Sequence, residues 1–159
     1  MTLLTDELRA QIGREATYTA PDEIGRAAIR YFAQAIGASN PAYLGAEPIA
    51  PPTMICETNS YTGQAADAEG YPGHGWDLDV PGTRLIRGGN AYEFHTPATA
   101  GDVLTVAWRL ESMTERTTAQ GLQMLLVTSV ATYRNQHGHL LAVNTETLIY
   151  LADRPGGGA

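Results

Sequence analysis

The sequence predicts an α+β fold in which a curved antiparallel β-sheet wraps around one long central helix. Two observations indicate this class. An early segment has the periodicity of an amphipathic helix, and the second half of the chain has the two-residue alternation of long strands. One apolar face on each element is buried most economically when the sheet curves around the helix.

The helix is expected over residues 20–36. Its apolar residues recur at the i, i+4, i+7, i+8 and i+11 spacing of one helical face, and they are Ile24, Ala28, Tyr31, Phe32 and Ala35. Thr19 and Asp22 make an acidic variant of the capping box at its start, and Gly37 suits the left-handed position after its last turn. Both ends of the helix are therefore marked in the sequence.

Five strands are expected around this helix. A weak strand over 11–18 precedes it, and another over 84–95 follows. From Val103 onward the chain predicts a meander of three long strands, of which the second and third cover 120–133 and 140–150, with a turn at Gln136–Gly138 between them. The order β-α-β-β-β-β is that of the hot-dog fold.

One domain is expected over residues 1–153, because 159 residues suit a single core, and the Gly-rich residues 154–159 are expected to form a flexible tail. Residues 40–83 are rich in Gly, Pro, Asn and Asp. A segment of that length is too long to be only a connector in a compact domain, and such loops are usually functional. The candidate site is therefore expected to involve it.

Composition argues against several classes of function. The net charge of -7 and the absence of a Lys/Arg cluster disfavour nucleic acid as a partner. The chain has no run of about 18 apolar residues, and its start turns acidic, so no membrane span is expected and a cytoplasmic location is predicted. The single Cys56 excludes an internal disulfide, and the histidines lack metal-ligand spacing, so no metal or other cofactor is expected.

Three segments carry a family resemblance. Ile29–Tyr43 reads as a helix that runs into an Asn-Pro loop, Ile49–Met54 contains a Pro-Pro pair, and Arg87–Leu104 contains a Gly-Gly pair and a later Gly-Asp turn. Together and in this order they resemble the MaoC-like dehydratase family, especially its N-terminal-domain branch, which includes subunits of heteromeric (R)-specific enoyl-thioester hydratases. The resemblance spans nearly the whole chain and implies the hot-dog fold.

Active members of this family carry an Asp-x-Asn-Pro-x-His loop, whose Asp and His exchange the protons needed to add water to an α,β-unsaturated thioester. In the present sequence Ala38 stands where the Asp belongs and Tyr43 where the His belongs, while Asn40 and Pro41 are retained. A methyl group has no proton to exchange, and a phenol, with an ordinary pKa of ~10, is a poor base at neutral pH. No catalytic residue is therefore assigned.

The resemblance implies a non-catalytic, acyl-chain-binding subunit of an (R)-specific enoyl-CoA hydratase or 3-hydroxyacyl-thioester dehydratase. A second MaoC-like chain in a heterodimer or heterotetramer would supply the Asp and His, and the substrate would be carried as a thioester of CoA or of an acyl-carrier protein. Because hot-dog domains pair through their sheets, a dimer is expected. Loss of the catalytic groups leaves room for a bulky acyl group, such as a steroid side chain, by analogy only.

The resemblance and the residue types also nominate substrate-binding residues, which are Asn40, Tyr43, Pro52, Thr53, Gly88, Gly89, Asn90 and Tyr92. For several of them a structural role is the alternative: Asn40 as a turn former, Gly88–Gly89 as a strand bulge, Tyr43 as packing. Glu93 and His95 alternate on a predicted strand and form the candidate replacement acid/base pair of a self-sufficient hydratase or thioesterase. The third alternative is a pure acyl-thioester binding module.

Overall fold

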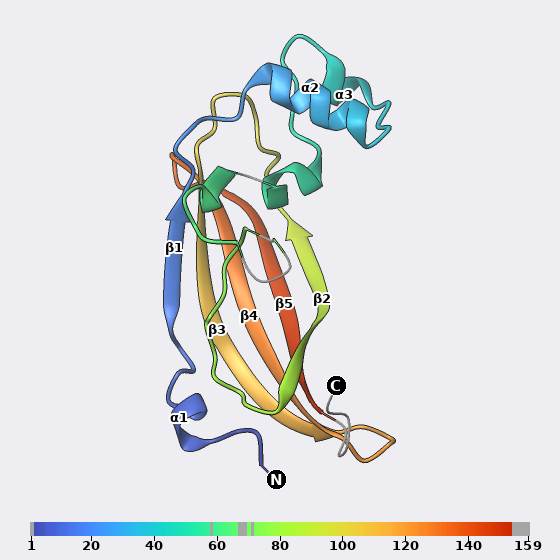
Figure 1. Cartoon of the computed structure of the whole chain (residues 1–159). Helices are drawn as coiled ribbons and strands as arrows, with labels where there is room; N and C mark the ends of the chain where they lie inside the picture. The colour runs from blue at the N-terminus through green and yellow to red at the C-terminus, as the bar shows by residue number, and fades with distance from the viewer. Residues whose placement is uncertain (1, 58, 67–69, 71, 154–159) are drawn as a thin grey trace.

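The computed structural model describes residues 2–57, 59–66, 70 and 72–153. Five antiparallel strands form one curved sheet in the order β1-β3-β4-β5-β2 (Figure 1). Their bounds are β1 Glu15–Thr19, β2 Thr83–Phe94, β3 Leu104–Thr117, β4 Gln123–Asn135 and β5 Leu140–Ala152. The predicted strands and the curved antiparallel hot-dog class are confirmed. The predicted tail, residues 154–159, lies outside the described residues.

Alternation along β3 sets the two faces of the sheet. Leu104, Val106, Trp108 and Leu110 are buried, whereas the residues between them are exposed or half-buried. We call the face that carries Trp108 the inner face and the opposite one the outer face. The turn between β4 and β5 closes through a hydrogen bond from Asn135 N to His139 O at 3.2 Å, so the predicted meander is confirmed.

The helices are shorter than expected. They are α1 Asp6–Arg9, α2 Arg26–Ala35 and α3 Pro41–Leu44, followed by the 3₁₀ turns η1 Pro52–Glu57 and η2 Asn59–Tyr61. The prediction that a helix begins near residue 20 is wrong. Ala20 N instead donates to Leu104 O at 2.8 Å and Ile24 N donates to Asp102 O at 2.9 Å, so long-range pairing takes the backbone groups that an earlier helix would need.

The end of α2 agrees with the prediction. Gly37 has a positive φ of 69°, its N–H donates to Gln34 O at 3.0 Å, and Ala38 N donates to Ala33 O at 2.8 Å. This pair of hydrogen bonds is a Schellman motif, which satisfies the last carbonyls of the helix and turns the chain toward α3.

The place of α2 differs from the expectation of a helix enclosed by the sheet. In Figure 1, α2 and α3 lie together beyond one end of the strands. The prediction of which helix face is buried is wrong: Ile29 and Ala33 are fully buried, whereas Tyr31 is 71% exposed. Ala20 and Ile24 hydrogen-bond to Leu104 and Asp102, so the helix starts late and only this shorter face turns inward.

The segment between α3 and β2 covers the inner face of the sheet instead. Its buried side chains include Tyr61 and Trp76. Trp76 Nε1 donates to Ser129 Oγ and Trp108 Nε1 donates to Tyr61 Oη, both at 2.8 Å. The Gly- and Pro-rich segment thus packs against the sheet. The indole N–H groups of Trp76 and Trp108 each donate to an acceptor, as buried indoles usually do.

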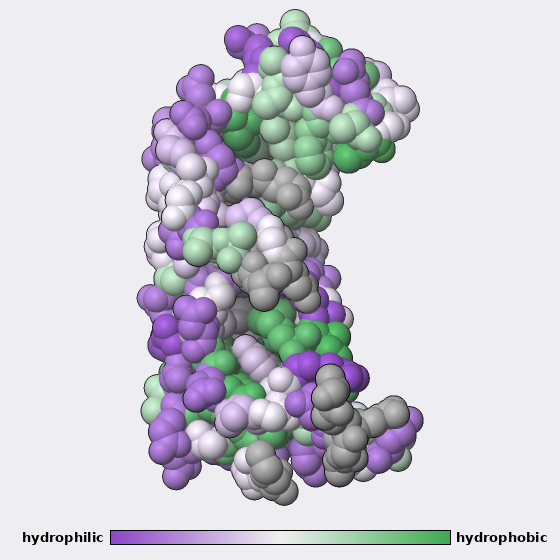
Figure 2. Space-filling model, in the orientation of Figure 1, coloured by the Kyte–Doolittle hydropathy of each residue, from purple (hydrophilic) through white to green (hydrophobic). Residues whose placement is uncertain are grey.

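Strand β2 is an edge strand that is exposed along almost its whole length. Three of its large apolar side chains, Leu85, Ile86 and Phe94, are 38–47% exposed. Figure 2 shows hydrophobic side chains on the side of the molecule where β2 lies. A long, apolar, unpaired edge is a surface to which another strand can pair.

A bulge interrupts the pairing of β2 with β5. Arg87 pairs with Leu148 and Gly89 with Thr147, so Gly88 is the extra residue. A Cβ on Gly88 would lie 2.8 Å from Thr147 O, which explains the glycine. The extra residue reverses the alternation, so that Arg87 and, beyond the bulge, Asn90 both face inward.

Candidate functional site

Two neighbouring cavities are lined by five of the ten residues that the sequence nominated. The first, which we call the loop pocket, has a volume of about 100 Å³. Its lining is Tyr43, Ile49–Pro52, Ile55, Phe94–Ala98 and Leu141. It lies where the loop after α2, the Pro-Pro segment and the end of β2 come together.

Short backbone contacts hold the loop pocket together. Asn40 caps α3, since its side-chain oxygen accepts a hydrogen bond from Ala42 N at 3.0 Å, and Ile49 N donates to Ala42 O at 3.0 Å. Ala50 N then donates to Ala98 O at 2.7 Å. These bonds place Tyr43 opposite the chain that leaves β2. The Asn-Pro loop therefore builds the pocket, and Asn40 acts through backbone geometry.

The loop pocket has no paired acid and base among its lining residues. Tyr43 is half-buried there, and Ala38 is half-buried outside the lining. His95 is the titratable imidazole on the wall. A hydration needs one group to remove a proton from water and another to deliver one to carbon. The described lining offers a phenol and one imidazole in an otherwise apolar cavity.

The second cavity, which we call the sheet pocket, has a volume of about 270 Å³ and lies on the inner face of the sheet. Its lining is Cys56, Tyr61, Arg87, Asn90, Tyr92, Trp108, Tyr133, Asn144 and Glu146. The strand register explains why they meet: Tyr92 pairs with Asn144, and Asn90 pairs with Glu146. The bulge at Gly88 is what turns Asn90 and Tyr92 toward this cavity.

The sheet pocket has a polar lining of which part is buried. Asn144 is 1% exposed; its Nδ2 donates to Asn90 Oδ1 at 2.7 Å, and its Oδ1 has no hydrogen-bond partner among the described residues. Burial raises the pKa of the Glu146 carboxyl, and the positive charge of Arg87 opposes that shift. Burial, with a smaller effect of Tyr92, raises the pKa of Tyr133.

The two pockets adjoin along β2 and η1. Tyr92 lines the sheet pocket and Phe94 lines the loop pocket, and their rings stack with centroids 5.6 Å apart. Ile55 and Cys56, which are consecutive, line one pocket each. A molecule held in one pocket therefore lies next to the other.

The structure divides the nominated residues. Tyr43, Pro52 and His95 line the loop pocket, while Asn90 and Tyr92 line the sheet pocket. The other five nominated residues line neither pocket, and they are Asn40, Thr53, Gly88, Gly89 and Glu93. Gly88 has the bulge role that the sequence left open.

Glu93 and His95 are not brought together. Glu93 pairs with Val143, is exposed, and lines neither pocket. His95 follows the end of β2 and lines the loop pocket. The sequence predicted that Glu93 and His95 share one face of a strand, but in the structure they do not line a common pocket.

Sequence reasoning missed three polar residues, of which Asn144 is buried and Glu146 and His74 are half-buried. Asn144 and Glu146 look like ordinary positions of a strand, and only the pairing with β2 places them in a cavity. His74 lies in the Gly-rich segment before β2, where its Nδ1 lies 2.9 Å from Tyr18 Oη and its ring stacks on Trp108 with centroids 5.0 Å apart. Burial lowers the pKa of His74 to about 4, with a further contribution from Arg14. No local pattern marks these environments.

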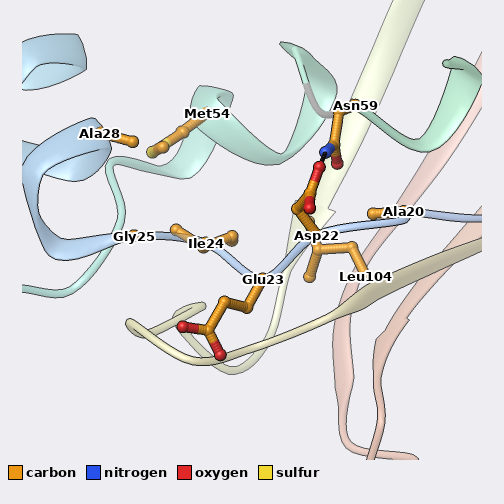
Figure 3. Close-up of a pocket in the computed structure, with 9 residues that line it drawn as sticks. All are labelled: Ala20, Asp22, Glu23, Ile24, Gly25, Ala28, Met54, Asn59 and Leu104. Atoms are coloured by element: carbon orange, nitrogen blue, oxygen red, sulfur yellow. Dashed lines mark hydrogen bonds between the residues drawn. The ribbon is translucent and has the colours of Figure 1, made fainter.

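A third cavity, of about 200 Å³, lies between residues 20–28 and the η1–η2 segment (Figure 3). In the close-up, Asp22 points toward Asn59, and Asp22 Oδ2 accepts a hydrogen bond from Asn59 Nδ2 at 3.0 Å, while the Glu23 carboxylate points to the other side of the chain. None of the nominated residues lines it. The Asp22–Asn59 bond links the extended segment to η2, which is a structural role.

The remaining candidates have structural roles or none. Asp102 is buried, and its carboxylate accepts hydrogen bonds from Thr99 N at 2.8 Å and from Asn135 Nδ2 at 3.0 Å, which agrees with the turn predicted before β3. Among the described residues there is no group of three or more His, Cys, Asp or Glu side chains that could hold a metal ion. In the same part of the chain, no helix is long and apolar enough to span a membrane.

The sequence matches one family model and several curated relatives. Residues 10–144 match the family model described as the FAS1-like, dehydratase domain region. A UPF0336 protein of Streptomyces coelicolor is 37% identical over 112 residues, which cover 64% of this chain and 70% of the relative. A probable enoyl-CoA hydratase alpha subunit of Thermomonospora curvata is 27% identical over 162 residues, covering 89% of this chain and 50% of that longer relative.

Solved structures agree in fold. A chain of the ChsH1–ChsH2 complex from Mycobacterium tuberculosis superposes with a TM-score of 0.66 at 16% identity, covering 90% of this chain and 85% of that one. A MaoC-like dehydratase from Rhodospirillum rubrum superposes with a TM-score of 0.61 at 18% identity, covering 91% and 94%. At these identities the likeness concerns the fold, and it is the hot-dog fold predicted from the sequence.

Proposed function

Because the chain belongs to the FAS1-like dehydratase region family, we propose that it is the non-catalytic, acyl-chain-binding subunit of a heteromeric (R)-specific enoyl-thioester hydratase or 3-hydroxyacyl-thioester dehydratase. A second hot-dog chain supplies the catalytic Asp and His. The substrate is carried as a thioester of CoA or of an acyl-carrier protein, no cofactor takes part, and the complex works in the cytoplasm.

One observation carries this proposal: Ala38 and Tyr43 stand where the family resemblance places the catalytic acid and base, on either side of Asn40 and Pro41. Asn40 caps α3 and Gly37 ends α2, so the loop between these helices is held by both caps while it carries neither an acid nor an imidazole at these two positions.

The exposed edge of β2 supports the partner in this proposal. Apolar side chains on an unpaired edge strand favour pairing with a second strand, which removes them from water and satisfies the free backbone groups. The loop pocket adjoins this strand through Phe94. A partner docked on β2 would therefore bring its own catalytic groups close to the acyl-binding cavities.

The self-sufficient alternative has less support. Glu93 lies on the outer face and His95 at the loop pocket, so these groups could not act on one substrate without rearrangement. The steroid side chain named by analogy is a member of the wider class of bulky acyl groups that two adjoining cavities suit.

The test is reconstitution. The chain is purified alone and together with the hydratase-like chain that co-purifies with it from the native source, and hydration of crotonyl-CoA and of a bulky enoyl-CoA is followed by loss of the enoyl absorbance. We expect turnover by the pair and only background turnover by the lone chain. Full activity of the lone chain would contradict the proposal, and ligand binding that no partner converts into turnover would favour a pure binding module.

A further inference from the structure

The sheet pocket has chemistry that a plain hydrocarbon chain does not explain. Asn144 is almost completely buried on its wall, and its Oδ1 has no partner among the described residues. Asn90 and Glu146, which pair across β2 and β5, add an amide and a carboxyl to the same wall. Buried polar groups in proteins are nearly always hydrogen-bonded, so an unpaired amide at a cavity indicates a missing partner.

An apolar ligand would leave the polar groups on this wall with fewer hydrogen bonds than water does. A methylene chain in the cavity would displace any water from Asn144 and Glu146 without replacing its hydrogen bonds. The volume of about 270 Å³ exceeds the roughly 150 Å³ of a cavity that holds benzene, so a substantial part of a ligand fits. The ligand that suits this pocket is therefore one with an oxygen atom among its carbons.

We propose that the sheet pocket binds a hydroxyl group on the distal part of the acyl group, several carbon atoms from the thioester. This inference rests on the proposed acyl-binding function and narrows its substrate class to oxygen-bearing acyl thioesters. A hydroxyl both donates and accepts, so it can donate to Asn144 Oδ1 and accept from a neighbouring group on the same wall.

The arrangement of the two pockets gives the position of that hydroxyl. Phe94 and Tyr92 lie two residues apart on one strand face, about 7 Å along the strand, and each lines one pocket. An acyl group whose first carbons occupy the loop pocket therefore reaches the sheet pocket with carbons farther along the chain. The hydroxyl that is lost or formed in the reaction itself stays at the thioester end and is a different group.

Glu146 suits a role as the second partner. Burial raises the pKa of its carboxyl, and the positive charge of Arg87 on the same lining opposes that shift. A carboxyl group can hydrogen-bond to a hydroxyl in either protonation state, as an acceptor when ionised and as a donor when protonated. The wall thus offers an acceptor at Asn144 and a second polar partner at Glu146.

The experiment compares two matched probes. Isothermal titration calorimetry measures the affinity of the full chain for octanoyl-CoA and for omega-hydroxyoctanoyl-CoA. We expect the hydroxylated thioester to bind about fivefold more tightly, the gain from one net hydrogen bond. Asn144→Leu should remove this preference and leave the affinity for octanoyl-CoA unchanged or higher. Glu146→Gln should reduce the preference, and Glu93→Gln, on the outer face, should preserve it.

Each outcome decides between the two proposals. Equal affinity of the unmodified chain for both thioesters would overturn the hydroxyl site and leave the acyl-binding function standing. A preference that survives both Asn144→Leu and Glu146→Gln would overturn the assignment to the sheet pocket. If neither thioester binds, the acyl-binding function itself fails and this inference with it. Circular dichroism checks folding, and should Asn144→Leu not fold, the two titrations of the unmodified chain still decide.

Discussion

The loop pocket and the sheet pocket adjoin, yet they are built in opposite ways. The loop pocket is made by backbone contacts between three loops, and its wall is largely apolar with no acid/base pair. The sheet pocket is made by side chains on regular strands, and its wall holds a buried amide, a carboxyl and a guanidinium. The loop pocket therefore owes its form to backbone contacts, whereas polar side chains are concentrated where the sheet register fixes them.

The largest effect is expected from restoring the missing groups of the loop. We expect the double variant Ala38→Asp with Tyr43→His to give the lone chain measurable hydration of crotonyl-CoA, roughly 10²-fold above its own background, because a positioned acid/base pair contributes about that much. Each single variant is the control and should stay at background. A double variant that stays inactive while it folds would mean that the loop has also lost its catalytic geometry.

The next effect concerns the bulge that turns Asn90 and Tyr92 into the sheet pocket. Gly88→Ala places a Cβ 2.8 Å from Thr147 O and should lower the free energy of unfolding by about 1 to 3 kcal/mol, as overpacking does. Gly89→Ala is the matched control, since a Cβ there meets nothing within 4 Å, and it should change stability by less than about 0.5 kcal/mol. Urea unfolding measures both, and equal losses would contradict this account of the bulge.

A smaller effect, which depends on pH, comes from His74, whose ring stacks on Trp108 at the sheet pocket. Its pKa in the folded chain is about 4, below the ordinary 6.5, so the unfolded chain binds this proton more strongly. The stability that neutral His74 contributes is therefore complete above pH 6.5 and is lost as the pH falls toward 4. Urea midpoints of His74→Phe should fall less over this range than those of the unmodified chain, and parallel curves would contradict the shift.

The smallest effect is expected at the alternative acid/base pair. Glu93→Gln should leave turnover by the reconstituted complex within about twofold, because Glu93 lies on the outer face and is not needed for proton transfer in the proposed mechanism. Initial rates with crotonyl-CoA measure this. A loss of tenfold or more in the initial rate of Glu93→Gln would show that this chain contributes a catalytic group.

Most strands could be predicted because their signal is local. The alternation along β3 and the β-branched and apolar residues of β4 and β5 are visible within each segment, and the bounds agree to within a few residues. The start of α2 could not be predicted, because Ala20 and Ile24 hydrogen-bond to Leu104 and Asp102, far away in sequence. A capping pattern at Thr19 and Asp22 describes only local preference, and the long-range pairing overrides it.

The candidate site was predictable only in part, for the same reason. That Ala38 and Tyr43 flank Asn40 and Pro41 could be read from the sequence, because contiguous residues form this loop. That Tyr43 and His95 share one cavity, and that Glu93 does not, depends on how the Pro-Pro segment pairs with the chain after β2. Single-strand alternation could not reveal this.

By itself the sequence determined the hot-dog class and the five strands, since these depend on residue type and on spacing along the chain. Only the tertiary structure decided which side chains line each cavity. One extra residue at Gly88 reverses the alternation of β2 and sets Asn90 and Tyr92 against Asn144 and Glu146, more than fifty positions farther along. Such pairing between distant strands leaves no periodic trace in either strand alone.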